Sequence, residues 1–291
     1  MKNRFCAPIL AIAALLASPG LSLHAQESEG TLEKIERTGE FLIGYRTDSS
    51  PLSYENAEGE PSGYSVDICR RIAANVNAYF DGQDIETKFV RISPEERLSA
   101  VIDGKIDIEC GSTTITLSRL EQVDYSLPTF VTGGSVLSLA ASGIQAMSDL
   151  AGKKVGVAKD TTTVEELRNY FTENLIDAEI VIVADRVEGM KRLNGGGIDA
   201  LASDQIVLIG QVIEALNPQR YSLVNEIFSF EPYGFVLRRN DADFRLVVNR
   251  AIAQLYRSGE EADIFYRWIG RIGIDVPPIM AVMYQLNALP E

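Results

Sequence analysis

Two consecutive stretches of this chain repeat one alternation of short apolar runs with longer amphipathic segments. In the first stretch the pattern predicts strands at 41–45, 86–90 and 106–110, separated by helices at 65–77 and 94–102. In the second it predicts strands at 154–158, 179–183 and 198–202, separated by helices at 163–171 and 187–193. Because alternating strands and helices favour parallel sheets covered by helices, we predict an α/β fold with one parallel sheet in each stretch.

Two glycine-containing segments, Thr132-Gly133-Gly134 and Pro232-Tyr233-Gly234, separate the stretches. Two crossings mean that the chain enters a second lobe and then returns, and the return is expected to carry a strand and one long helix from Asp241 through Trp268. About 265 residues also exceed a comfortable single core. We therefore predict a first lobe at 30–132, a second at 133–231, a return segment at 232–276 and a tail at 277–291. Ligands of such folds bind at the carboxyl ends of strands, here between the lobes.

The first 25 residues have the pattern of a secretory signal peptide. Lys2 and Arg4 precede a short apolar stretch, Pro19 and Gly20 interrupt it, and the segment ends on the small residue Ala25. The apolar stretch is too short to span a membrane. We expect an exported, periplasmic protein that begins near residue 26.

Removal of that segment leaves 25 basic and 41 acidic residues, a net charge of −16. Such a charge disfavours nucleic acids and anionic membranes as partners. The segment also contains the only histidine, His24, so a serine–histidine–aspartate triad or a histidine-ligated metal is excluded. We expect no metal, no cofactor and no catalytic residues.

Two cysteines, Cys69 and Cys110, remain after removal of the signal segment. In an oxidising compartment a pair of cysteines favours a disulfide, and two are too few for a zinc site. Two buried free thiols are the alternative, because the sequence does not give the Cα separation that a disulfide requires. We predict the disulfide.

A hydroxyl cluster at Ser112 to Thr114 follows the strand expected at 106–110, and Arg119 lies further along. If a helix starts there, its free N–H groups attract anions, and an arginine adds two parallel hydrogen bonds. The pattern predicts a carboxylate site. An ordinary helix cap with a solvated arginine is the alternative.

The second stretch repeats this pattern at Thr162 and Thr163, which follow the strand 154–158. Asp204 follows the strand expected at 198–202, where a carboxylate can pair with an ammonium group; a loop cap is the alternative. Arg46, Arg97 and Arg186 also follow expected strands, on the side where the hydroxyl clusters lie. Each arginine alone is more often a surface cation, but together they favour an anionic ligand.

These segments resemble the periplasmic amino-acid-binding proteins of ABC importers, solute-binding protein family 3. The resemblance rests on Gly44-Tyr-Arg, Pro51-Leu-Ser-Tyr, Gly63-Tyr-Ser-Val-Asp, Asp160-Thr-Thr-Thr, Asp204 and Tyr233-Gly. The stretch Glu109-Cys-Gly-Ser-Thr-Thr with Arg119 is the most specific part, and it is similar to the glutamate/aspartate-binding branch.

The resemblance implies a two-lobe periplasmic-binding-protein fold of type II with the ligand between the lobes. It implies a monomer that captures L-glutamate or L-aspartate and delivers it to an inner-membrane ABC permease. Ser112, Thr114, Arg119 and Thr162 would hold the α-carboxylate and Asp204 the α-ammonium. Arg46 and Arg97 would hold the side-chain carboxylate.

Three positions depart from the relatives: Arg186 replaces a histidine, Pro94 a serine and Leu52 a phenylalanine. Arg186 would keep a preference for anions as a further ligand residue. These departures leave glutamate, aspartate or another dicarboxylate open.

Two alternative functions also fit the sequence. A cyclohexadienyl dehydratase-like enzyme needs a cleft acid or base with a shifted pKa, and the acids Asp48 and Asp204 have non-catalytic partners in prospect. A sensor ectodomain is disfavoured, since no later stretch is long enough for a membrane span.

Overall fold

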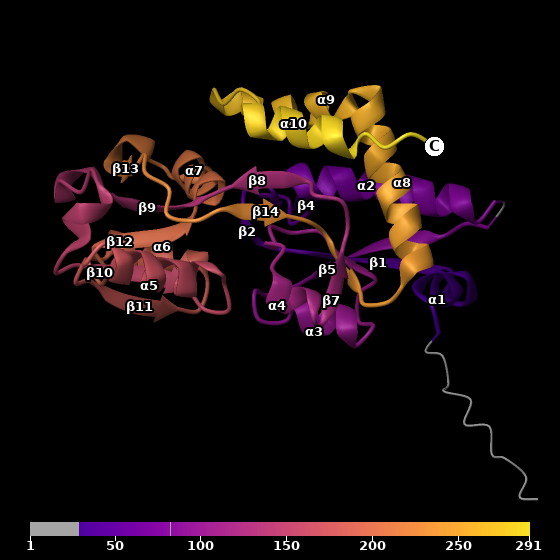
Figure 1. The fold of residues 1–291 in the computed structure, drawn as a ribbon, viewed down its shortest axis with the longest axis horizontal. Helices are drawn as coiled ribbons and strands as arrows, with labels where there is room; N and C mark the ends of the chain where they lie inside the picture. Colours follow the sequence, from indigo (N-terminus) through magenta and orange to yellow (C-terminus); the bar gives the residue numbers. More distant parts are fainter. Residues whose placement is uncertain (1–28, 82) are drawn as a thin grey trace, which may run out of the picture.

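The computed structural model describes residues 29–81 and 83–291, which form two lobes, each built on a five-stranded sheet (Figure 1). The expected signal peptide, with Cys6 and His24, lies outside the described residues. Across the described ranges, no helix combines the length and apolar character that a membrane crossing requires.

The sheet of the first lobe has the order β5-β1-β6-β15-β7. Its strands are β1 (Glu40–Tyr45), β5 (Glu86–Arg91), β6 (Ile108–Glu109), β7 (Val123–Tyr125) and β15 (Val236–Arg238). Strand β1 pairs in parallel with β5 and β6, whereas β15 runs antiparallel to both β6 and β7. The strand that follows the second crossing thus completes the first sheet.

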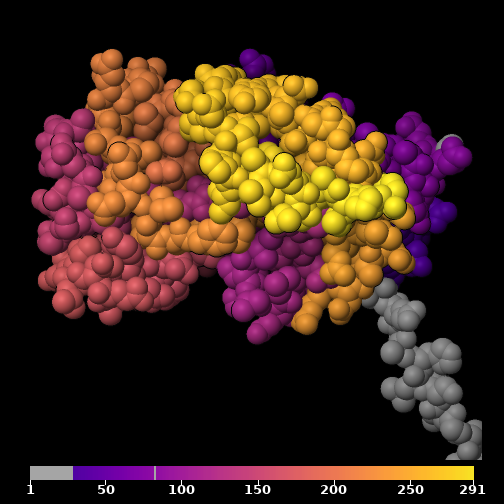
Figure 2. All heavy atoms as spheres, turned by 45° about the horizontal axis from the view of Figure 1, so that its top comes forward, coloured from indigo at the N-terminus to yellow at the C-terminus, as the bar shows by residue number. Residues whose placement is uncertain are grey.

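Helices cover both faces of this sheet. One face carries the larger core and the helices α1 (Thr31–Thr38), α2 (Tyr64–Tyr79), α8 (Ala242–Ser258), α9 (Glu260–Trp268) and α10 (Pro278–Asn287). The short helices α3 (Arg97–Ile102) and α4 (Leu117–Leu120) pack against the other face. The C-terminal residues, yellow in Figure 2, extend over the first lobe, where Met280, Met283 and Tyr284 join its core.

The sheet of the second lobe has the order β11-β10-β12-β9-β13. Its strands are β9 (Gly134–Leu139), β10 (Lys154–Ala158), β11 (Glu179–Val183), β12 (Ala200–Asp204) and β13 (Tyr221–Leu223). Side chains alternate across the sheet: Val155 and Val157 pack under α5 (Thr163–Glu173), and Leu201 packs on the opposite face. That face carries α6 (Arg186–Asn194) and α7 (Gln205–Glu214).

Two antiparallel strands carry the chain between the lobes, β8 (Phe130–Thr132) and β14 (Glu231–Tyr233). Thr132 pairs with Glu231 at the end of this ribbon nearer the second lobe. A three-stranded sheet of β2 (Asp48–Ser49), β3 (Ser53–Glu55) and β4 (Pro61–Ser62) belongs to the first lobe.

Two expectations from the sequence are corrected. Both sheets are mixed, not wholly parallel, because β15 and β7 in one and β9 and β13 in the other run antiparallel to a neighbouring strand. The long helix expected from Asp241 through Trp268 is two helices, since Gly259 adopts φ +79° between α8 and α9. A left-handed residue ends the helical hydrogen-bond pattern, and glycine adopts it without steric cost.

Candidate ligand-binding site

A buried network of ion pairs joins Arg46, Asp48, Arg186 and Asp204. The Nη2 atom of Arg46 lies 2.5 Å from Asp48 Oδ1, and Nη1 of Arg186 lies 3.8 Å from Asp48 Oδ2. Arg186 Nη2 in turn lies 3.3 Å from Asp204 Oδ2. Asp48 follows β1 in the first lobe, whereas Arg186 and Asp204 belong to the second. The network therefore links the two lobes at their junction.

Arg186 is satisfied entirely by this protein's own groups. Besides the two carboxylates, its Nε donates to Ser203 Oγ at 2.8 Å and its Nη1 donates to Ser49 Oγ at 3.2 Å. Burial alone would lower the pKa of Arg186, but the carboxylates of Asp48 and Asp204 outweigh it and raise that pKa. The residue expected to contact the ligand is placed as a bridge between the lobes.

The pKa of Asp48 is lowered for the complementary reason. Burial would raise it, but the charges of Arg46 and Arg186 on either side favour the ionised carboxylate more strongly. Arg46 is nearly fully buried, and in the part of the chain that the structure describes its Nε has no hydrogen-bond partner. One N–H group of Arg46 thus remains available to an added acceptor.

Arg97 and Arg119 differ from the other two arginines because they contact backbone carbonyls. Arg97 donates to the carbonyls of Pro94 and Asp160, the latter at 2.6 Å, and Arg119 donates to Thr114 O at 2.8 Å. Within residues 29–81 and 83–291, neither arginine forms an ion pair. Burial, reinforced by the positive charges of Arg119 and Arg46, lowers the pKa of Arg97 to about 9. An anionic ligand beside these two cations would add to the charge compensation that the buried Glu109 gives Arg97.

Asp204 keeps one carboxylate oxygen free. It ends β12 and directly precedes α7, and its side chain is buried. Oδ2 pairs with Arg186, while the buried Oδ1 has no hydrogen-bond partner among the described residues. A buried acceptor without a partner is costly, so this atom is suited to a cationic donor.

Glu231, a residue that the sequence analysis missed, lies between the two hydroxyl clusters. Its Oε2 accepts hydrogen bonds from Thr114 Oγ1 at 2.6 Å and from Thr162 Oγ1 at 3.0 Å, and Ser229 donates to its Oε1 at 2.7 Å. Burial, with the nearby charge of Asp204, raises the pKa of Glu231. Because each hydroxyl has one proton, Thr114 and Thr162 cannot donate a hydrogen bond to a ligand while they donate to Glu231. In the sequence, the signal that could have identified Glu231 was its place directly before the crossing expected at 232–234.

The expected helix start at Ser112 to Thr114 is not found. Helix α4 begins at Leu117 after the cap Thr116. The preceding segment is extended because the crossing strand pairs with it: Thr114 forms a bridge with Tyr233, and Ile115 N donates to Pro232 O at 2.8 Å. Ser112 instead contacts β2 of the same lobe, where its hydroxyl donates to Ser49 Oγ at 3.3 Å.

Helix α5 starts where the sequence predicts, with Thr162 at the cap position and Thr163 as the first helical residue. The side chain of Thr162 makes no capping hydrogen bond, since it faces Glu231 and lies 3.4 Å from Thr114 Oγ1. Thr162 therefore connects the second lobe to the first.

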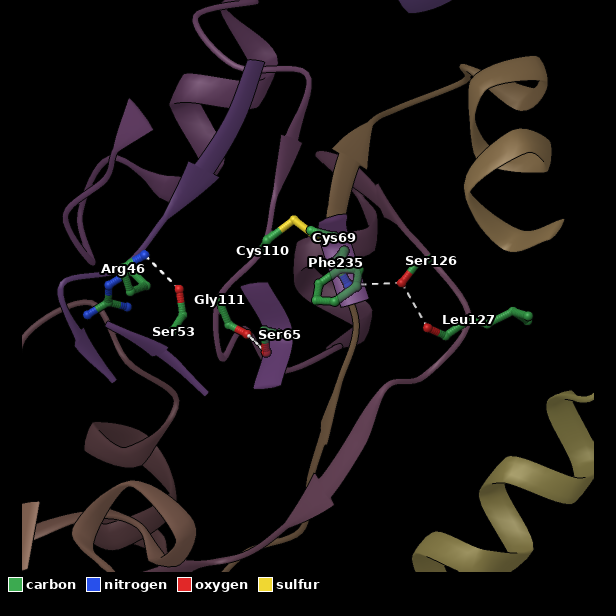
Figure 3. Close-up of a disulfide and its surroundings, with 9 residues drawn as sticks. All are labelled: Arg46, Ser53, Ser65, Cys69, Cys110, Gly111, Ser126, Leu127 and Phe235. Carbon is green, nitrogen blue, oxygen red and sulfur yellow. Dashed lines mark hydrogen bonds between the residues drawn. A yellow bond between two sulfur atoms is a disulfide. The ribbon is translucent and has the colours of Figure 1, made fainter. Parts of the chain in front are cut away.

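Cys69 and Cys110 form a disulfide that ties α2 to the segment after β6 (Figure 3). Ser65 of the same helix donates to Gly111 O at 2.8 Å. Figure 3 shows both links beside Arg46, whose backbone N–H donates to Ser53 Oγ at 3.0 Å. The disulfide and the Ser65–Gly111 hydrogen bond fix the segment that carries Ser112 and Thr114.

Glu109 lies directly before this disulfide and is fully buried. Within residues 29–81 and 83–291, neither of its carboxylate oxygens has a hydrogen-bond partner. Burial raises its pKa, although the charges of Arg97 and Arg46 act in the opposite direction. The carboxylate lies over Gly111, where a Cβ would approach Glu109 Oε1 to 2.0 Å.

All eight expected ligand residues thus lie around the junction of the lobes, and each of them also contacts protein groups there. Two mixed sheets joined by two crossing strands form a type II periplasmic-binding-protein fold. A solved structure of an ABC transporter periplasmic binding protein from Brucella ovis with glutathione bound is similar, with a TM-score of 0.73 and 26% identity. The match covers 90% of this chain and 81% of that one.

Residues 41–271 match the model of the bacterial extracellular solute-binding proteins, family 3, and the chain belongs to this family. It is 33% identical over 268 residues to the L-glutamate/L-aspartate-binding protein of Pseudomonas aeruginosa, covering 92% of this chain and 87% of that protein. It is 31% identical over 264 residues to the glutamate/aspartate import solute-binding protein of Escherichia coli, covering 90% and 87%. The expected family and fold are confirmed.

Membership of this family defines the general activity. The chain is an amino-acid-binding protein that serves an ABC importer. Family 3 proteins are non-catalytic binding proteins, so the dehydratase-like alternative is set aside.

Proposed function

We propose that this protein captures L-glutamate or L-aspartate in the periplasm, as a monomer, and delivers it to an inner-membrane permease. The observation that carries the proposal is the pair Arg97 and Arg119, two cations that form no ion pair within the described residues, together with Asp204 Oδ1, which accepts no hydrogen bond there. An acidic amino acid has two carboxylates and one ammonium group. Its two carboxylates are complementary to the charges of Arg97 and Arg119, and its ammonium group is complementary to the charge of Asp204.

The proposed pose follows from these contacts. Arg119, which contacts Thr114 O, holds the α-carboxylate together with Ser112, and Asp204 Oδ1 accepts from the α-ammonium. Arg97 holds the side-chain carboxylate, with the free Nε–H of Arg46 as a further donor. Each charge-assisted hydrogen bond contributes about 1.5–3 kcal/mol net, so four or five support roughly micromolar binding after ordering costs.

Binding and closure are coupled in this proposal. Arg97 donates to Asp160 O across the junction, and Thr114 and Thr162 meet at Glu231. A ligand that contacts both lobes only when they are closed favours the closed state by its difference in affinity. The hinges are 132–134 and 232–234. Closure around the ligand then presents the form that docks on the permease.

A thermal-shift panel of the common amino acids tests the proposal. A ligand at 100 times its Kd stabilises the folded state by about 2.7 kcal/mol, which raises Tm by roughly 5–10 °C for a chain of this size. We expect this shift with L-glutamate or L-aspartate and none with L-glutamine or L-asparagine, which have the same shapes without the second charge. A larger shift with a neutral or basic amino acid would refute the acidic ligand.

A further inference from the structure

Gly210, near the middle of α7, faces the backbone of the first lobe across the junction. A Cβ added to Gly210 would lie 2.0 Å from Ser50 O, 2.4 Å from Ser50 C and 2.9 Å from Pro51 N. All three are backbone atoms, so no rotation of a side chain relieves the clash. The neighbouring Gln211 donates to Asp48 O at 3.3 Å, which holds the helix against the same segment.

Helix α7 itself has no need of this glycine. Gly210 lies inside a helix that runs from Gln205 to Glu214, and its φ is outside the left-handed range. Glycine in a helix interior costs about 1 kcal/mol relative to alanine. The closed arrangement of the lobes is therefore what excludes a side chain at this position.

We infer that Gly210 is a positioning residue that allows the lobes to close, although it does not touch the ligand. A methyl group at position 210 would then leave each lobe intact and sterically prevent the two lobes from closing. The inference rests on the proposed function in that closure is taken to accompany ligand capture.

Gly210→Ala and Gly210→Val test this steric effect. Gly197→Ala is the control, because a Cβ there meets Arg192 at an ordinary 3.6 Å. We expect the affinity for L-glutamate or L-aspartate to fall at least tenfold with alanine and further with valine. The ligand-free Tm of Gly210→Ala should stay the same or rise, since alanine favours the helix. Unchanged affinity in both variants would overturn the inference, as would a parallel loss of affinity and ligand-free Tm, which indicates ordinary structural damage.

A second measurement does not depend on the ligand's identity. Glu95 of the first lobe and Lys159 of the second form an exposed ion pair across the junction. Cysteines at both positions are joined by a short bis-maleimide only when the lobes meet, and the native Cys69 and Cys110 are buried in their disulfide.

We expect cross-linking of the ligand-free protein to slow at least tenfold with Gly210→Val and to be unchanged with Gly197→Ala. Equal rates, or no cross-link in any variant, would overturn the inference. If cross-linking slows as expected but no acidic amino acid accelerates it in the protein with Gly210, the proposed ligand is wrong and the role of Gly210 stands.

Discussion

Arg186 of the second lobe and Asp48 of the first form a buried ion pair across the junction, with 3.8 Å between Nη1 and Oδ2. Asp48 also pairs with Arg46, and Arg186 also pairs with Asp204. When the lobes separate, these charges meet water. Their contacts therefore contribute to the difference between the open and closed states.

Arg186→Ala should weaken ligand binding at least 100-fold. Removal of one partner from a buried ion pair costs about 3–5 kcal/mol, because Asp48 and Asp204 would be buried without it. The penalty applies to the closed state, so the ligand-free Tm should change little. Calorimetric titration and thermal unfolding measure the two effects. Arg192→Ala on the same helix is the control, since its exposed pair with Glu188 contributes little. Equal affinities of the two variants would contradict the role of Arg186 as a link between the lobes.

Arg119→Ala and Arg97→Ala should differ in what they do to specificity. Loss of Arg119 removes the α-carboxylate contact and should cost at least about 2 kcal/mol, roughly 30-fold, for any amino acid that binds. Loss of Arg97 should weaken the binding of L-glutamate by a similar factor and leave unchanged the binding of L-glutamine, which is too weak to give heat in a direct titration. Competition titration with both amino acids gives the ratio. The same ratio in both variants would refute the separate assignments.

Replacement of Cys69 and Cys110 by serine should lower the free energy of unfolding by about 2–4 kcal/mol, because their disulfide closes a loop across 41 residues. Urea unfolding of the oxidised protein and of the double variant measures this difference. Since the disulfide also fixes the segment that carries Ser112, affinity should fall as well. A double variant as stable as the oxidised protein would show that the disulfide is dispensable.

Glu109→Gln should stabilise the ligand-free protein at pH 7, and this advantage should shrink as the pH falls. Burial raises the pKa of Glu109, so the folded state favours the protonated carboxyl. In the protein with Glu109, the stabilisation that comes from the protonated carboxyl is fully present below the unfolded pKa of about 4.3. It is lost as pH rises through the folded pKa. Glutamine stays neutral at every pH. Urea unfolding at several pH values tests this, and an advantage that grows toward low pH would contradict it.

The sequence was sufficient for those parts of the fold that local patterns determine. Apolar periodicity placed β1, β10 and β11 close to their observed positions, because strand and helix periods depend on neighbouring residues. It did not give the antiparallel pairing of β9 with β12, since the direction of β9 depends on how the chain crosses between the lobes. The break at Gly259 was missed because the helical period continues on both sides of it.

The site was predicted as a set of residues but not as a set of contacts. Arg46, Arg97 and Arg186 follow strands, and parallel strands bring their carboxyl ends to one edge. Their partners come from distant parts of the chain: Asp48 and Arg186 belong to different lobes, and Glu231 reaches Thr114 from the second crossing strand. Such pairings are set by tertiary structure, and no local pattern contains them.

Calorimetric titration of the ligand-free protein, unfolded and refolded with its disulfide intact, tests the central claim most directly. The titrants are L-glutamate, L-aspartate, L-glutamine and L-arginine. We predict micromolar or tighter binding of L-glutamate or L-aspartate and no measurable heat with the other two. Binding of L-glutamine or L-arginine as tight as that of the acidic pair, or no heat with either acidic amino acid, would contradict an acidic amino acid as the ligand.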